Sequence, residues 1–369
     1  MKRFSSNTLV KILLGCTAAA ILSSAFYLDP GRNQDQGWAP DAPISLAVLG
    51  DSDSHSYHDH LMIPETTSSR GGKLRPVTWQ WTEVLARLRG RYIDEGEWGI
   101  WGMPVKLAEI LDRLGWGGRA PRKEDYRFNF AVSGAECSDL MTGYYRQAPR
   151  LVALMDQEPT RWAAWVVSIR IGVNTLCKTT DLDRFAREGA TPAVKLEVTQ
   201  CVDWIRQAVA LIRQRHPQTR FVLVGIFDNA NWAPDVGRWQ SAQAHGNIVA
   251  VLDIFDDALR RLVEGDTHMA FFDDRAWFRK YWGDRGPDGR PVYGQVNFGG
   301  RVSVTNTQGD EPVHATVTDG HAGSVWNELW AKDFIALLNA AFGANIPPLS
   351  TEEIVRFVDA DGTFGLKPR

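Results

Sequence analysis

The sequence lacks an excess of positive charge, an apolar run long enough to span a bilayer, and low-complexity segments. Its 41 Lys and Arg residues stand against 44 Asp and Glu residues, a formal net charge of −3 at pH 7. Domains that bind nucleic acids are usually basic, so we expect no nucleic acid as a partner. A hydrophobic content of 44% with 23% charged residues excludes collagen-like and intrinsically disordered classes. A chain of 369 residues can bury a large core without metal ions or disulfides.

The N-terminal residues have the pattern of an export signal. Lys2, Arg3 and Lys11 precede an uncharged apolar run over residues 12–26, and small residues before the end of this run suit cleavage after Ala25. The run is shorter than the ~20 residues that cross a bilayer. We therefore predict an export signal over residues 1–25 and a periplasmic or secreted protein. An uncleaved N-terminal segment is the alternative, and only there do we expect contact with a membrane.

Cysteine is rare, with four residues in the whole chain, one of them inside the predicted signal. After export, Cys137, Cys177 and Cys201 would lie in an oxidising compartment, where a disulfide persists. Cys177 and Cys201 could pair and leave Cys137 free. Cys201 also lies on the apolar stripe of a strongly helical segment, a place where buried free cysteine is common. Both interpretations stay open from the sequence.

Short apolar runs rich in β-branched and aromatic residues alternate with amphipathic segments. The runs that we interpret as buried strands cover residues 44–49, 128–132, 165–171, 221–226 and 269–272. The main predicted helices cover residues 81–88, 105–114, 191–216, 248–262 and 326–341. Buried strands that alternate with helices are typical of a mostly parallel sheet covered on both faces. We predict an α/β protein, a three-layer α/β/α sandwich with a mostly parallel sheet of about five strands.

These elements fit one domain over residues 26–343. Residues 276–318 are rich in Gly, Asp and Pro and lack helical periodicity, so we expect a long inserted loop or a small hairpin there. Residues 344–369 are expected to form a C-terminal tail.

Polar residues directly follow the predicted strands, at the sheet edge where parallel α/β folds bind their ligands. The first strand is followed by Gly-Asp-Ser-Asp-Ser at residues 50–54. Ser52 in this turn is a candidate nucleophile, provided that a base elsewhere in the chain takes its proton. The alternative is that its side chain only caps the next element.

Further polar groups follow the second and third strands and precede the last helix. The N–H groups of Ser52 and Gly134, with the side-chain amide of Asn174, are donors that could hold a developing oxyanion. Each is also a common turn residue. His321, with Asp319 two residues earlier, would supply the base and the carboxylate that orients it. The alternative for this pair is a loop histidine beside an ordinary turn.

These four blocks, in this order, resemble the SGNH (GDSL-type) hydrolase superfamily over nearly the whole predicted domain. The resemblance implies that Ser52 is the nucleophile and that Gly134 and Asn174 complete the oxyanion hole. It also implies that His321 is the base and Asp319 the acid, and that the chemistry uses no metal and no cofactor.

The sequence departs from the family's pattern in two places. The third block usually reads Gly-x-Asn-Asp, whereas Thr175 follows Asn174 here. The last block usually places the acid three residues before the histidine, whereas Asp319 lies two residues before His321. The second departure puts the acid in question, so a Ser-His dyad steered by a backbone carbonyl is the alternative to a triad.

Two other groups of residues invite a functional interpretation. His55, His58 and His60 follow the candidate nucleophile, but their spacing does not match a tetrahedral zinc site, and we expect a polar rim to the crevice. The chain has 15 tryptophans, and those in loop-like or boundary regions could present flat faces to sugar rings. The tryptophans in this group are Trp98, Trp101, Trp116, Trp232, Trp239, Trp277 and Trp282.

Taken together, these features predict an exported serine esterase that removes a short acyl group, such as acetyl, from a carbohydrate or a related polar ester. A polysaccharide O-acetyltransferase that uses the same residues is the first alternative. A non-catalytic glycan-binding protein on the same scaffold is the second. The expected partner is a small-molecule or glycan ester, and the sequence does not specify an oligomeric state.

Overall fold

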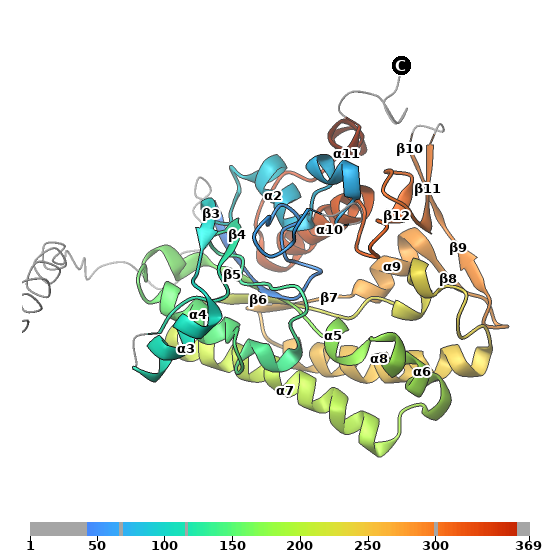
Figure 1. Cartoon of the computed structure of the whole chain (residues 1–369), viewed down its shortest axis with the longest axis horizontal. Coiled ribbons are helices and arrows are strands. Elements are labelled where there is room, and N and C mark those ends of the chain that lie inside the picture. Colours follow the sequence, from blue (N-terminus) through green and yellow to red (C-terminus); the bar gives the residue numbers. More distant parts are fainter. Residues whose placement is uncertain (1–42, 66–68, 115–116, 299–301, 360–369) are drawn as a thin grey trace, which may run out of the picture. The chain divides into compact units, whose positions relative to one another are not determined.

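A five-stranded parallel sheet lies at the centre of the structure, a computed structural model that describes residues 43–65, 69–114, 117–298 and 302–359 (Figure 1). The strand order is β2-β1-β5-β6-β7, and every neighbouring pair is parallel. The strands are β1 (Ile44–Gly50), β2 (Ile93–Asp94), β5 (Val166–Arg170), β6 (Arg220–Val224) and β7 (Met269–Phe272). The predicted export signal and Trp116 lie outside the described residues.

Helices cover both faces of this sheet, so the predicted three-layer α/β/α class is confirmed. The α2 (Trp81–Arg89) and α10 (Ser324–Phe342) helices pack together on one side, and α7 (Pro192–Arg215) and α8 (Ala242–Val263) on the other (Figure 1). All residues of β1 and β5 are buried, as strands covered on both faces must be. Among the described helices, none combines the length and the apolar character that crossing a bilayer requires.

The helix boundaries follow the local signals in the sequence. The α7 helix begins where the Thr191 side chain accepts a hydrogen bond from the N–H of Val194, with Pro192 at the first helical position. Its apolar stripe, which includes Ile205, packs into the core below the sheet. Each fully buried side chain of this kind contributes about 1.5–3 kcal/mol to the free energy of folding. The α10 helix ends at Gly343, as predicted.

The prediction of a strand at residues 128–132 is wrong in its detail. This segment runs beside β1, and the N–H of Phe130 donates to the carbonyl of Val48 at 2.7 Å, but it forms only an isolated bridge. The ladder is interrupted because the N–H of Gly50, which would continue the pairing to the carbonyl of Phe130, donates instead to Oε1 of Gln147 at 2.8 Å. The fifth strand is instead β2, whose two residues are too few to be recognised as an apolar run.

The remaining helices and small strands surround this core. The helices are α3 (Val105–Arg113), α4 (Gln147–Met155), α5 (Val173–Leu176), α6 (Thr179–Glu188), α9 (Asp274–Trp282) and α11 (Thr351–Val358). The strands β3 (Trp98–Trp101) and β4 (Lys123–Tyr126) form an antiparallel pair, and α3 lies between them in the chain. The α11 helix lies within the segment that we expected to be a tail.

The segment 276–318 differs from the expected loop or single hairpin. It opens inside α9, because the side chain of Asp273 caps the N–H of Ala276 and starts a helix there. The small strands after α9 are β8 (Gly283–Arg285), β9 (Pro291–Tyr293), β10 (Gln295–Phe298), β11 (Val302–Gln308) and β12 (His314–Thr316). Trp277 and Trp282 are buried against Trp326, so these two tryptophans are core residues and not sugar-binding faces.

The disulfide joins Cys137 to Cys201, with a sequence separation of 64. The suggested Cys177–Cys201 pair is therefore wrong, and Cys177 is a buried free thiol among the described residues. Cys201 does lie on the buried stripe of α7, as the helical pattern predicted. That stripe packs against the short helix η2 (Cys137–Leu140), which brings Cys137 and not Cys177 to it.

Candidate active site

One cavity at the carboxyl end of the sheet brings together three of the predicted site residues. Ser52, Asn174 and His321 all line this cavity, which has a volume of about 230 Å³. They arrive from the turn after β1, from α5 after β5, and from the loop before α10. We call this space the serine cavity. Gly134 and Asp319 are not among its lining residues, although Asp319 precedes Gly320, which does line the cavity.

Close packing holds the turn that carries Ser52. The N–H of Gly50 donates to Oε1 of Gln147 at 2.8 Å, and a Cβ at Gly50 would lie 2.4 Å from the carbonyl oxygen of Arg170. Only glycine fits this position. Further along the turn, Gln80 donates to the carbonyl of Ser52 at 3.1 Å. Among the described residues, neither the hydroxyl nor the N–H of Ser52 has a hydrogen-bond partner, so both remain available to a ligand.

Two buried ionisable groups, Arg170 and Asp51, lie at the turn that carries Ser52. Arg170, at the end of β5, donates to the carbonyl of Asp53 at 2.9 Å and pairs with the buried carboxylate of Asp274 at 3.0 Å. The side chain of Asp51 points into the protein, where Oδ1 accepts the N–H of Asp53 at 3.0 Å. Burial, together with the nearby Asp53 carboxylate, raises the pKa of Asp51 to about 8. Asp51 is therefore a structural group that is largely protonated below this pH.

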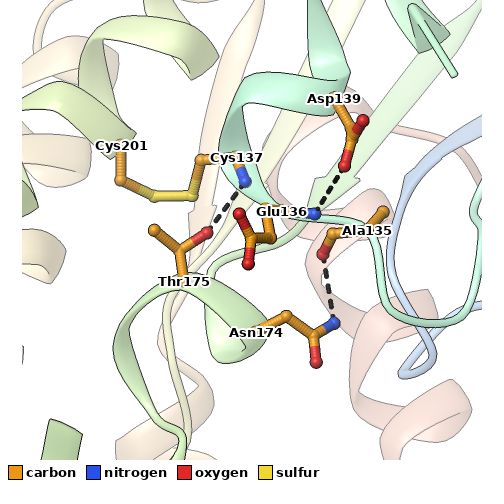
Figure 2. Close-up of a disulfide and its surroundings, with 7 residues drawn as sticks. All are labelled: Ala135, Glu136, Cys137, Asp139, Asn174, Thr175 and Cys201. Atoms are coloured by element: carbon orange, nitrogen blue, oxygen red, sulfur yellow. Dashed lines mark hydrogen bonds between the residues drawn. A yellow bond between two sulfur atoms is a disulfide. The ribbon is translucent and has the colours of Figure 1, made fainter. Parts of the chain in front are cut away.

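The two loops that carry Gly134 and Asn174 are joined to each other (Figure 2). The side-chain amide of Asn174 donates to the carbonyl of Ala135 at 3.1 Å, and the N–H of Cys137 donates to Oγ1 of Thr175 at 2.9 Å. Thr175 stands where the family usually has an aspartate, and it also supplies an oxygen acceptor. The disulfide links the loop of Gly134 to α7 through Cys137 and Cys201. The two candidate oxyanion donors, Gly134 and Asn174, therefore lie on loops that are bonded to each other and anchored to this helix.

The short spacing between Asp319 and His321 does not prevent their side chains from meeting. Nδ1 of His321 lies 3.0 Å from Oδ1 of Asp319, and the backbone N–H of His321 donates to the same oxygen at 3.1 Å. The tight turn needs Gly320 at φ 85, a conformation that other residues rarely adopt. Partial burial alone would raise the pKa of Asp319, but its bonds to His321 and the charge of Arg70 hold that pKa below its ordinary value.

Arg70 is a site residue that sequence reasoning missed. Its Nη1 lies 2.6 Å from Oδ2 of Asp319 and 2.7 Å from Nδ1 of His321, and its Nη2 donates to Oγ of Ser133 at 3.2 Å. Because the guanidinium can only donate, Nδ1 of His321 either donates its own proton to Asp319 or accepts one from Arg70. The first tautomer leaves Nε2 of His321 unprotonated and able to accept a hydrogen bond. No motif surrounds Arg70, so no local signal could have identified it.

The expected polar rim of histidines is wrong for all three residues. His55 is fully buried, and its Nε2 lies 2.8 Å from Oδ2 of Asp59. Its Nδ1 accepts the backbone N–H of Ser133 at 3.0 Å and lies 2.9 Å from the Ser133 hydroxyl. Burial lowers the pKa of His55, which is consistent with a neutral ring protonated on Nε2. His58 and His60 pair with glutamates and line other cavities.

Within the described ranges, one group of side chains is close enough to hold a metal ion. The ligand atoms of Asp228, His245 and Asp284 lie within 4.8 Å of one another. However, Asn231 donates to both carboxylates, at 2.9 Å to Asp228 and 3.2 Å to Asp284. Arg285 also bonds to the oxygen of Asn231 at 2.8 Å. Both carboxylates thus already accept a protein donor, whereas Nε2 of His245 has no hydrogen-bond partner among the described residues. The expectation of a metal-free reaction stays a prediction.

Comparison with known proteins finds similarity at the level of three-dimensional structure. No family model matches the sequence, and no curated protein matches it either. The solved structures that it resembles include an extracellular lipase from Streptomyces rimosus, with 15% identity and a TM-score of 0.36 over 81% of this chain and 99% of that chain. A GDSL-like lipase from Parabacteroides merdae has 14% identity and a TM-score of 0.38 over 84% and 100% of the two chains.

A carbohydrate esterase of family 2 with a carbohydrate-binding domain, from Corynascus thermopiles (Myceliophthora fergusii), is also similar. It has 16% identity and a TM-score of 0.32, over 82% of this chain and 69% of that chain. These structures are lipases and esterases, and one is of the GDSL type that the four sequence blocks resemble. With identities and TM-scores this low, the function has to be argued from the residues of this chain.

Proposed function

We propose that the protein is an exported serine esterase of the SGNH type that hydrolyses short acyl esters, acetyl esters of carbohydrate in particular. The observation that carries the proposal is that Ser52, Asn174 and His321 line one cavity although they come from distant parts of the chain. A nucleophile, an oxyanion donor and a base are the three groups that ester hydrolysis through an acyl-enzyme requires.

The reaction begins when Nε2 of His321 takes the proton of the Ser52 hydroxyl and Oγ attacks the ester carbonyl carbon. The N–H groups of Ser52 and Gly134 and the amide of Asn174 hold the oxyanion, and one such donor is worth about 2.7–4 kcal/mol in the transition state. His321 returns the proton to the leaving alcohol as the C–O bond breaks. Water then attacks the acyl-enzyme with His321 as base, and the acid leaves as Ser52 regains its proton.

The size and lining of the serine cavity support a small acyl group. At about 230 Å³ it is smaller than the 300–1,000 Å³ typical of pockets for drug-sized ligands. Trp232 and Phe227 form part of its wall. Trp232 belongs to the tryptophans that we expected to face sugar rings, and it is half-buried beside His321 and not part of the core. An aromatic face at the cavity is suited to a sugar ring next to the ester.

The disulfide supports the export part of the proposal. Structural disulfides form and persist in secreted and periplasmic proteins and are rare in the cytosol. Cys137 and Cys201 are joined in the structure, and the N-terminal residues have the pattern of an export signal.

The test is hydrolysis of a series of chromogenic esters with increasing acyl length by the purified mature protein. We expect turnover of the acetyl ester to exceed that of the octanoyl ester, and Ser52→Ala and His321→Ala to lose at least about 10³-fold in kcat/KM. Ser303→Ala, at an exposed serine, is the matched control and should retain full activity. Turnover that survives Ser52→Ala would exclude the proposed nucleophile. Adding a polysaccharide acceptor and measuring acyl transfer distinguishes the transferase alternative.

A further inference from the structure

A second cavity, which shares no lining residue with the serine cavity, is lined by four arginines. It has a volume of about 420 Å³. It lies among α3, α4 and the antiparallel β3–β4 pair, which gather at one side of the sheet in Figure 1. We call it the arginine cavity. Its charged lining residues are Arg119, Arg127, Arg146, Arg150 and one carboxylate, Asp112. We propose that it binds an anionic ligand that carries carboxylate or phosphate groups.

The two inner arginines have little negative charge to balance them. Arg150 is buried, with 6% of its side chain exposed, and it donates to the carbonyl of Ala120 at 2.8 Å. Its distance to Asp112 is 3.4 Å, and its buried Nε has no hydrogen-bond partner. Arg119 donates to the backbone carbonyls of Arg127 and Asn129. Carbonyl dipoles satisfy hydrogen bonds but leave the positive charge of both guanidinium groups in place.

The other two arginines are more accessible. Arg127 and Arg146 have 25% and 40% of their side chains exposed. Each has one acidic partner, Glu158 at 3.1 Å and Asp112 at 3.2 Å. Since Asp112 is shared with Arg150, the four guanidinium groups have two carboxylates within salt-bridge distance, only one of which lines the cavity. A ligand with negative charge would relieve this excess, and planar guanidinium groups bind carboxylate and phosphate in a two-point geometry.

The size and the aromatic lining narrow the class of ligand. A cavity of about 420 Å³ has room for a sugar-sized molecule and not only for a single inorganic ion. Trp101 lines the same cavity and is half-buried, and the guanidinium of Arg127 lies over its ring, 5.5 Å from the ring centroid. The geometry therefore points to a saccharide that carries an acidic group. This inference goes beyond the proposed esterase activity and does not depend on Ser52, since none of these four arginines lines the serine cavity.

Calorimetric titration of the full mature protein tests the site directly. The probes are inorganic phosphate, trigalacturonate and the neutral trisaccharide maltotriose. We expect saturable binding of at least one anion, weakened by added salt, and much weaker binding of maltotriose. Arg127→Gln combined with Arg146→Gln should weaken anion binding at least about tenfold. Arg206→Gln combined with Arg290→Gln, which removes two exposed arginines outside the cavity, is the charge-matched control and should bind like the wild type.

The two anions distinguish the sources of the ligand chemistry. Tighter binding of trigalacturonate identifies a uronic-acid saccharide, and binding of phosphate alone identifies a phosphate-bearing ligand. An independent readout is the Tm of the wild-type protein, which should rise with anion concentration because the anion binds only the folded state. The proposal is overturned if neither anion binds, if maltotriose binds as tightly as trigalacturonate, or if the double variant folds and binds anions unchanged.

Discussion

Nη1 of Arg70 lies 2.6 Å from Oδ2 of Asp319, across a sequence separation of 249 residues. The backbone N–H of Arg70 donates to the same oxygen at 3.0 Å. Both side chains are largely buried, with 7% and 19% exposed. These two hydrogen bonds hold the loop that carries His321 against the segment around Arg70, which follows Ser52 in the chain. It also orients the Asp319 carboxylate so that its other oxygen meets Nδ1 of His321 despite the shortened spacing.

The first prediction concerns the role of Asp319. If its carboxylate orients His321 in the reaction, Asp319→Asn should lower kcat by up to about 10⁴-fold, because the amide can stabilise the wrong tautomer of the imidazole. The measurement is kcat on the acetyl ester, with Asp288→Asn, at an exposed carboxylate, as the control. Activity close to that of the wild type would favour the Ser-His dyad.

The second prediction uses the pH dependence of stability to test the Arg70–Asp319 pair. The pKa of Asp319 is held below its ordinary value, so its ionised form stabilises the fold fully above that ordinary value. This stability is lost as the pH falls from the ordinary value towards and through the lowered pKa of the folded state. Removing the guanidinium in Arg70→Met should raise the pKa of Asp319 towards its unfolded value.

The variant should therefore be less stable than the wild type at pH 7 but lose less stability on acidification. Urea unfolding at pH 7 and at pH 3 measures this difference. Arg70→Lys keeps the charge without the two-point geometry and should fall between the two. Equal loss of stability on acidification in all three proteins would show that Arg70 does not act through the Asp319 carboxylate.

The third prediction concerns the oxyanion donor on α5. Asn174→Ala should lower kcat about 10²–10³-fold with little change in KM, because the amide stabilises charge that develops only in the transition state. Its bond to Ala135 also braces a loop, so the Tm is measured in parallel. Asn297→Ala, at an exposed asparagine, is the control. A large rise in KM with kcat unchanged would assign Asn174 to substrate binding alone.

The fourth prediction concerns the disulfide. Replacing both Cys137 and Cys201 with alanine should cost about 4 kcal/mol of stability, the chain-entropy value for a loop closed over a separation of 64. Activity should fall as well, since the same bridge braces the loop that carries Gly134 and the residues bonded to Asn174. Cys177→Ala should remain sensitive to reducing agent, whereas the double variant should not. Reductant sensitivity that disappears in Cys177→Ala would contradict the observed pairing.

The fifth prediction concerns Asp51. Burial, with the nearby Asp53 carboxylate, raises the pKa of Asp51 to about 8, above its unfolded value of about 4. The folded state then binds more protons than the unfolded state between these values, so this residue makes stability fall as the pH rises from about 4 to 8. Asp51→Asn should flatten the decline, as measured by urea unfolding across that range. A decline identical to that of the wild type would contradict the raised pKa.

Local patterns in the sequence predicted the central layers well. The strands β1, β5, β6 and β7 are short apolar runs with β-branched and aromatic residues, and α7 begins at the cap signal of Thr191 and Pro192. The same logic brought Ser52 and Asn174 to one edge of the sheet, because the carboxyl ends of parallel strands lie together. The two-residue strand β2 was missed, and the segment 128–132 was wrongly predicted to be a full strand. In both cases the hydrogen bonding depends on a neighbouring strand and not on the segment's own residue pattern.

What the sequence alone determined is what short-range chemistry encodes: periodicity, caps, and polar residues placed directly after buried strands. Tertiary structure decided the pairing of Cys137 with Cys201, the contact of Arg70 with Asp319, and the burial of His55 beneath Ser133. Each of these depends on which distant segments pack against each other. A cysteine, an arginine or a histidine looks the same in the sequence whichever partner the fold later places beside it.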